Sequence, residues 1–183
     1  SLFEDDANYQ SNPIGDFNEA YYIVDRLNEQ IGLSPSEYNL QTPQATLEHF
    51  IVSCRNMEFD KAIYALNFNL FPKSLTKEDA AILAEKLYFV INQRVNIDWD
   101  NLSDRPDGQI DISTTTNSAV AGAPRRSLVF GEVDYKGRDI VLRLQRVRYK
   151  NYGAFWLISA NTTDNIENMY AQYGPRELDL MMP

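Results

Sequence analysis

The sequence contains few of the residues that most often carry metal, redox or nucleophilic chemistry. Among its 183 residues there is one cysteine and one histidine. A single cysteine cannot form an internal disulfide, so the cysteine content does not distinguish an oxidising from a reducing compartment. A histidine metal site or a Ser-His-Asp triad would depend on His49 alone, which we interpret as a surface or boundary residue. Cys54 falls in line with apolar positions of a predicted helix, which indicates an inert, buried thiol.

Positive charge and long apolar runs are also scarce. Seventeen Lys and Arg against 26 Asp and Glu give a net charge of −9 and an isoelectric point near 4.6. Such a surface repels phosphate backbones, so we expect no nucleic-acid partner. No segment reaches the roughly 20 apolar residues of a membrane-spanning helix, and the N-terminus lacks the features of a signal peptide. Because the chain begins at Ser1 without a methionine, a targeting or membrane segment outside these residues stays an open possibility.

The composition is that of a folded chain, with 44% hydrophobic and 12% aromatic residues. Its pattern predicts an N-terminal helix and linker over residues 1–41, a single domain over 42–175, and a membrane-proximal junction segment over 176–183. The expected fold class is α+β: about four N-terminal helices, then an antiparallel three-stranded meander and a C-terminal helix.

Helical periodicity dominates the first half of the chain. Asp16 and Glu19 are typical of a helix start, and we expect that first helix to end at Gly32. Thr42 followed by Pro43 predicts the start of the second helix. The apolar positions of this second helix repeat at helical spacing, at Leu47, Phe50, Ile51 and Cys54.

Two further helices follow. A third, with apolar positions at Phe59, Ala62, Ile63 and Leu66 and its end at Phe71-Pro72, should form a hairpin with the second. Thr76 and Asp79 make a capping box before residues 80–95, an apolar segment that we expect to be a central helix covered by two neighbours. After it, residues 96–126 are rich in turn formers and predict an ordered loop between a helical half and a strand half.

Strand patterns occupy the second half. Residues 127–135, 138–149 and 154–159 predict the three strands of the meander, and a last helix is expected from about Thr163 to Tyr173 with Gly174 as its C-cap. The apolar positions of the middle strand change parity, which predicts a bulge or strong bend near Gln145 and Arg146. We expect one contiguous core of Leu47, Phe50, Ile51, Ala62, Ile63, Leu66, Leu83, Leu87, Leu142, Leu144, Trp156 and Ile158.

The loop of residues 96–126 holds the densest group of carboxylates. Hard cations such as calcium bind several oxygen ligands on a loop, which makes these residues a candidate metal site. The spacing does not fit the calcium loop of an EF-hand, and the segment "RPDGQ" is typical of a turn, so we interpret the group as a turn with a solvated acidic surface. The carboxylates are Asp98, Asp100, Asp104, Asp107 and Asp111.

Three other groups of residues merit a functional interpretation. Asn161, Thr162 and Thr163 match a glycosylation sequon, but they also fit the cap of the last helix, which we favour. A basic cluster indicates either a solvated sheet face or a site for an anionic partner. Aromatic side chains next to the predicted bend are candidates for lining a pocket. The basic residues are Arg125, Arg126, Arg143, Arg146 and Arg148, and the aromatic residues are Phe130, Tyr149, Phe155 and Trp156.

Three long segments carry a resemblance to a known family. They read "TPQATLEHFIVSCRNMEFDKAIYALN", "AEKLYFVINQRVNIDWDNLSDRPDGQID" and "FWLISANTTDNIENMYAQYGPRELDLMMP". Their order and spacing over residues 42–183 resemble the N-terminal extracytoplasmic region of one group of bacterial MscS-type small-conductance mechanosensitive ion channels. The shared pattern is a Thr-Pro helix start, an Ile-Asp loop with an Asp-Gly turn, and a Trp-Leu strand before a helix that ends in Tyr-Gly-Pro.

The resemblance implies a non-enzymatic accessory domain on the periplasmic side, anchored to the membrane in a longer protein, that modulates gating or assembly. It implies as partners the rest of the channel chain, identical subunits and the membrane near the C-terminus. It assigns no catalytic, cofactor-binding or metal-binding residue and no cofactor. The membrane helices and cytoplasmic domain of such channels are not among these residues, so this segment by itself cannot conduct ions.

Two other classes of function stay open beside the channel domain. One is a periplasmic small-ligand-binding module with a pocket between helices and a curved sheet. The other is an enzyme that uses loop carboxylates as acid and base, which requires a close pair with shifted pKa values. The apolar tail favours the channel domain: we expect Arg176 to Pro183 to leave the fold after Gly174 and Pro175 and to point towards a bilayer.

Overall fold

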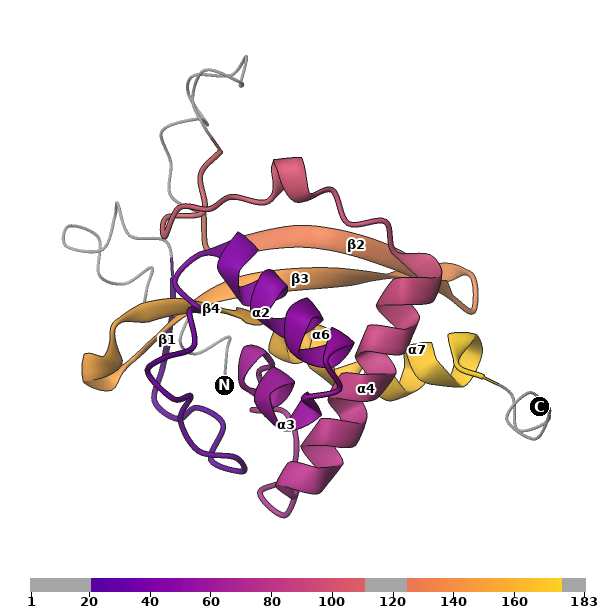
Figure 1. The fold of residues 1–183 in the computed structure, drawn as a ribbon, viewed down its shortest axis with the longest axis horizontal. Coiled ribbons are helices and arrows are strands. Elements are labelled where there is room, and N and C mark those ends of the chain that lie inside the picture. The colour runs from indigo at the N-terminus through magenta and orange to yellow at the C-terminus, as the bar shows by residue number, and fades with distance from the viewer. Residues whose placement is uncertain (1–20, 111–124, 176–183) are drawn as a thin grey trace.

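The computed structural model describes residues 21–110 and 125–175. These residues form helices packed against a mixed four-stranded sheet, as Figure 1 shows. The predicted α+β class is therefore correct. The described ends of the chain lie apart, with strand β1 on one side of the molecule and helix α7 on the opposite side.

Helix α2 (Pro43–Arg55) begins and ends where the sequence predicts. The Thr42 hydroxyl oxygen accepts a hydrogen bond from the Ala45 N–H at 3.0 Å, and proline occupies the first helical turn. Helix α3 (Phe59–Ala62) continues into a 3-10 turn (Ile63–Ala65), and α2 and α3 are in contact as expected. The predicted third helix is thus present but shorter, because the chain becomes extended at Leu66.

Helix α4 (Lys77–Arg94) is the long helix of the fold. Thr76 and Asp79 form the predicted capping box, with each side chain bonded to the backbone N–H of the other residue. The helix packs against α3 and α7 through one apolar face, while Ile82 on the other side is 51% exposed. Two neighbours therefore cover α4, but its outer side faces solvent.

Strands β2 (Ser127–Tyr135), β3 (Arg138–Tyr149) and β4 (Ala154–Ile158) form the predicted antiparallel meander. The register shifts within β2, between Val129 and Gly131. The pairing of β3 with β4 is continuous from Leu144 to Arg148, so the bulge predicted near Gln145 and Arg146 was wrong.

The fourth strand, β1 (Tyr22–Val24), pairs in parallel with the end of β3. The helix predicted up to Gly32 was therefore wrong over the described residues from 21 onward. The backbone is left-handed at both Asn28 (φ 47°) and Gly32 (φ 82°), which interrupts any helix there. The Asn28 side chain donates to Leu66 O at 2.8 Å and accepts from Phe68 N at 2.7 Å, which fixes this segment to the chain after α3.

A second small core explains the change of parity in β3. Val147 is fully buried together with Val24, Leu27, Leu40 and Leu157, whereas Leu142 and Leu144 belong to the main core. The sheet is thus covered on both faces near the end of β3, by the helices on one and by residues 21–40 on the other. The change of parity marks this second cover.

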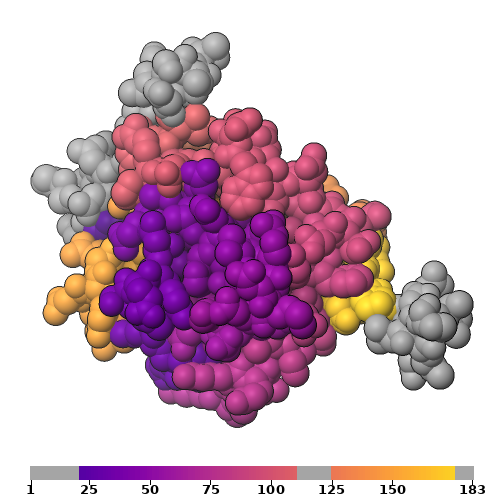
Figure 2. Space-filling model, viewed as in Figure 1, coloured from indigo at the N-terminus to yellow at the C-terminus, as the bar shows by residue number. Residues whose placement is uncertain are grey.

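The main core confirms the predicted cluster, because every one of its twelve predicted residues is buried in it. Helices α6 (Ala160–Asp164) and α7 (Ile166–Tyr173) follow β4, and the N-cap is Ser159. The prediction that residues 161–163 cap this helix was wrong, since they lie in its first turn. Gly174 is the C-cap of α7, as predicted, and its backbone there is extended (φ −72°). In the space-filling view the helical half covers the visible face, with α7 at its edge (Figure 2).

Candidate functional site

The most elaborate polar arrangement surrounds Trp156 of β4, whose side chain is fully buried. Its Nε1–H donates to Pro106 O at 2.9 Å. The Asp107–Gly108 turn passes directly over the indole ring, where a Cβ added at Gly108 would lie 2.7 Å from Trp156 Cζ2. Gly108 also has a left-handed backbone (φ 72°), so this position requires glycine for two independent reasons.

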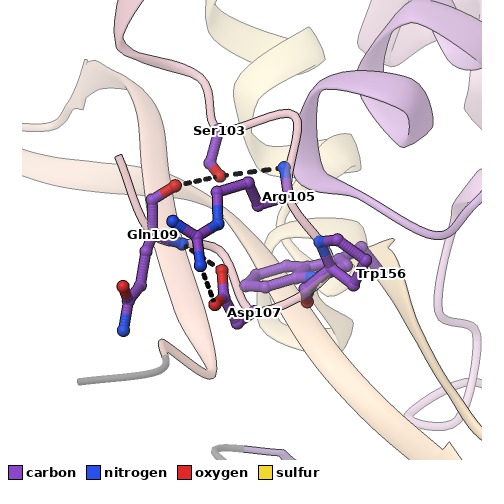
Figure 3. A network of polar contacts seen from close by, with 6 residues as sticks. Ser103, Arg105, Asp107, Gln109 and Trp156 are labelled. Atoms are coloured by element: carbon purple, nitrogen blue, oxygen red, sulfur yellow. Dashed lines mark hydrogen bonds and ion pairs between the residues drawn. The ribbon is translucent and has the colours of Figure 1, made fainter. Parts of the chain in front are cut away.

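The loop over Trp156 is closed by its own hydrogen bonds, as Figure 3 shows. The Ser103 hydroxyl donates to Gln109 O and accepts from Arg105 N at 3.1 Å. Arg105 forms an ion pair with Asp107 at 2.7 Å, and the Asp107 carboxylate also accepts from Gln109 N at 3.0 Å. We call residues 103–109 together with Trp156 the Trp156 clasp.

Helix α2 and its N-cap are hydrogen-bonded to the Trp156 clasp. The Thr42 hydroxyl donates to Asp104 Oδ1 at 2.8 Å, and Gln44 N donates to Ser103 O at 3.0 Å. The buried Thr46 hydroxyl donates to Trp156 O at 2.9 Å. The start of α2, the acidic loop and the Trp-bearing strand thus meet in the Trp156 clasp.

Three of the acidic residues of this loop each bond a different side chain. The carboxylates of Asp98, Asp104 and Asp107 accept from Asn101, Thr42 and Arg105 respectively. No cluster of three or more His, Cys, Asp or Glu side chains suited to a metal ion occurs within residues 21–110 and 125–175. Asp111, the last residue of the predicted group, lies outside the described residues. The arrangement stabilises a loop, which agrees with the turn interpretation.

His49 and Cys54 both lie on α2. The half-buried His49 ring packs on Tyr38 with a centroid distance of 4.6 Å, and its Nε2 lies 2.9 Å from Lys61 O. Cys54 is 1% exposed, which confirms its predicted burial. Burial, with a smaller effect of the nearby Glu85 carboxylate, raises the pKa of the Cys54 thiol to about 12. The thiol therefore stays protonated and unreactive at neutral pH.

The Asn161 side chain of the sequon is exposed at the start of α6, whereas the two threonines are buried. The Thr163 hydroxyl donates to Ser159 O at 2.9 Å, and the Thr162 hydroxyl donates to Val141 O at 3.2 Å. The Thr162 hydroxyl thus attaches α6 to β3, while the Thr163 hydroxyl bonds within the first turn of its own helix.

Three of the five predicted basic residues converge at the end of the sheet where β1 begins. The guanidinium of Arg126 lies 5.0 Å from the centroid of the Tyr22 ring, and those of Arg146 and Arg148 lie over Tyr21. Arg143 does not join them, because it is an odd number of positions from Arg146 and Arg148 on β3 and therefore faces the opposite side of the sheet. Arg125 contacts the loop instead, because its backbone N–H donates to Asp107 O at 2.8 Å. We call Tyr21, Tyr22, Arg126, Arg146 and Arg148 the arginine–tyrosine patch.

The four aromatic residues predicted to line a pocket do not share one. Phe130 and Trp156 are buried in the main core, while Tyr149 and Phe155 pack against the second core. Phe155 instead borders an open groove of about 310 Å³ with aromatic walls. The groove is lined by Leu33, Pro35, Tyr38, Leu40, Tyr152 and Phe155.

Sequence reasoning found the Asp-Gly turn and Trp156 separately, but not their contact. The residues are about fifty positions apart, and no local periodicity connects them. One indication was present: both lie in the segments that carry the family resemblance. Residues 176–183, predicted to leave the fold as a junction, lie outside the described residues.

Comparison of the chain with models of known protein families, with curated proteins and with solved structures found no match. Within the described ranges, no helix has the length and hydrophobicity needed to cross a membrane.

Proposed function

We propose that this chain is a non-enzymatic extracytoplasmic accessory domain of an MscS-type mechanosensitive channel, which modulates gating or subunit assembly. The observation that carries the proposal is the Trp156 clasp. Three motifs of the family resemblance, which are the Thr-Pro helix start, the loop with its Asp-Gly turn and the Trp-Leu strand, contact one another there. Motifs far apart in sequence that meet in one structural unit support a shared fold more strongly than the same motifs taken separately.

The chemistry of the clasp supports a structural role. Its donors and acceptors are paired with one another and with α2, and its central ring is fully buried. A catalytic acid–base pair would instead need carboxylates held near a cleft with pKa values suited to proton transfer. The clasp makes the helical half and the sheet one unit, which suits a domain that transmits force or positions subunits.

A cysteine-labelling experiment tests the location. Met57 is 78% exposed and lies next to Cys54, which is buried and protonated. Met57→Cys, in the full protein expressed in intact cells, should react with a membrane-impermeant maleimide, while the parent protein should stay unlabelled. Labelling of Met57→Cys only after lysis would place the domain on the cytoplasmic side and contradict the proposal.

A patch-clamp experiment tests the role. Deleting residues 42–175 from the full protein should leave a pressure-activated channel whose gating threshold or subunit assembly is altered. A full protein without mechanosensitive current, with the domain present or deleted, would contradict the channel assignment.

The aromatic groove supports a second candidate, a small-ligand-binding module. Tyr152 is 62% exposed and its ring stacks on that of Tyr149, with a centroid distance of 5.7 Å. Tyr38 packs against the tilted His49 ring, so each aromatic wall contacts a second ring. The groove lies between residues 33–41 and β4 and not between helices and sheet. A thermal-shift screen of small polar metabolites tests this candidate: a true ligand should raise the melting temperature of the protein but not of Tyr152→Ala.

A further inference from the structure

The arginine–tyrosine patch concentrates positive charge in an acidic protein. Arg146 and Arg148 are two residues apart on β3 and therefore lie on the same face. Arg126 is adjacent to them, because Arg146 N donates to Arg126 O at 2.9 Å. The guanidinium groups of Arg146 and Arg148 thus lie over the Tyr21 ring and that of Arg126 lies over the Tyr22 ring. Strand β1, which begins at Tyr22, is on the side of the molecule opposite α7 (Figure 1).

The tyrosines hold these side chains in a defined arrangement. Arg148 Nη1 donates to the Tyr21 hydroxyl at 2.9 Å, and its guanidinium also lies 5.5 Å from the Tyr21 ring centroid. A guanidinium carries five N–H donors in a planar fork, a geometry that matches carboxylates. Tyr21 and these arginines have further interactions in the fold, so an acidic ligand would add to or exchange with existing contacts.

The charge of the chain is distributed unevenly along its sequence. Residues 1–20 contain five acidic residues and no Lys, Arg or His, and so contribute −5 of the total charge of −9. The other 163 residues carry the remaining −4. The acidic segment is joined directly to Tyr21, which lies beneath Arg146 and Arg148. The acidic residues are Glu4, Asp5, Asp6, Asp16 and Glu19.

We propose that the arginine–tyrosine patch is a docking site for carboxylate-rich polypeptide, and that its occupant in this protein is the chain's own acidic segment, residues 1–20. Opposite charges favour the contact, and the covalent link at Tyr21 gives the segment a high effective concentration at the patch. Charged contacts at a protein surface weaken as salt increases, so high ionic strength or a competing polyanion releases the segment.

The test uses the full chain and a fluorescein-labelled synthetic peptide with the sequence of residues 1–20. In one variant the five acids become amides (Glu4→Gln, Asp5→Asn, Asp6→Asn, Asp16→Asn and Glu19→Gln). This variant should bind the peptide at least about tenfold more tightly than the unaltered chain, because its patch has lost the internal competitor. Binding should weaken with added salt, and a peptide with the same five amides should not bind.

Substitutions in the patch complete the test. In the amide variant, Arg146→Gln with Arg148→Gln should abolish peptide binding. Lys136→Gln with Arg138→Gln is the matched control, since it removes the same charge from two exposed residues, in the turn after β2 and at the start of β3, and should leave binding unchanged. If the double arginine variant fails to fold, Arg148→Gln alone, at an exposed position, replaces it and should weaken peptide binding. Equal peptide binding by the unaltered chain and the amide variant, or equal losses in the arginine variant and its control, would overturn the proposal.

Discussion

Gly108 is the residue at which the loop of the Trp156 clasp approaches the sheet most closely. Gly108→Ala should destabilise the protein for two reasons, a left-handed backbone and a Cβ 2.7 Å from the indole ring. Gly137 provides the control, because it has a similar backbone (φ 82°) with nothing within 4 Å of an added Cβ.

Gly137→Ala should therefore cost only the backbone strain, about 1–2 kcal/mol. Gly108→Ala should cost about 1–3 kcal/mol more, from crowding in a packed site. The free energy of unfolding in urea measures both variants. Equal costs would mean that the loop does not pack on Trp156 as described.

Cys54 should be chemically silent in the folded protein. Burial raises the pKa of its thiol to about 12, above that of an unfolded thiol, so the reactive thiolate is scarce in the native state. A thiol reagent at pH 8 should react slowly with the native protein and rapidly in denaturant. Met57→Cys, at a neighbouring exposed position, should label quickly in both conditions. Fast native labelling of Cys54 would indicate an accessible thiol and reopen a redox role.

The pKa of Cys54 also has a consequence for stability. Because the folded pKa lies above the unfolded one, the contribution of the buried thiol is complete below about pH 8.5 and is lost as pH rises towards the folded value. Unfolding measured between pH 8 and pH 11 should show a smaller loss of stability in Cys54→Ala than in the parent protein. The same pH dependence in both proteins would contradict the burial of this group.

At the scale of elements, residues 21–40 and the end of β3 form the second core. Val147 is fully buried there, whereas Val129 of β2 is 47% exposed. Val147→Ala should cost about 2–3 kcal/mol through the cavity that it leaves. Val129→Ala makes the same chemical change on an exposed strand position and should stay within about 0.5 kcal/mol of the parent. A small effect of Val147→Ala would show that residues 21–40 do not cover the sheet.

Local chemistry predicted some of these elements and not others. Capping by Thr42 and by Thr76 with Asp79, together with apolar spacing, located α2 and α4, because these interactions join residues three or four positions apart. Strand β1 was missed because three residues are too few to show an alternating pattern. Val24 in this strand and Leu27 after it also fit helical spacing. Only pairing with β3, more than 120 residues later, decides its conformation.

The candidate sites likewise contain some features that local sequence predicts and others that it does not. Burial of Cys54 followed from its place in an apolar stripe, and the Asp107–Gly108 turn followed from its residue types. The contact of that turn with Trp156, and the meeting of Arg126 with Arg146 and Arg148, depend on tertiary packing. The sequence alone does not show which of these distant residues are close in space.

At the scale of the whole molecule, the question is whether residues 176–183 are a junction segment or part of the packed core. Changing its apolar residues to serine should alter the free energy of unfolding by no more than about 0.5 kcal/mol, as for positions outside a packed core. A loss of several kcal/mol would place the tail in the protein's interior and contradict the junction role. The residues changed are Leu178, Leu180, Met181 and Met182.

The assignment as a channel domain is tested most directly by the coding sequence that follows the Pro183 codon. A domain of this kind should be followed immediately by segments of roughly 20 apolar residues, each long enough to span a bilayer. A stop codon at that point, or a continuation without any such segment, would contradict the assignment.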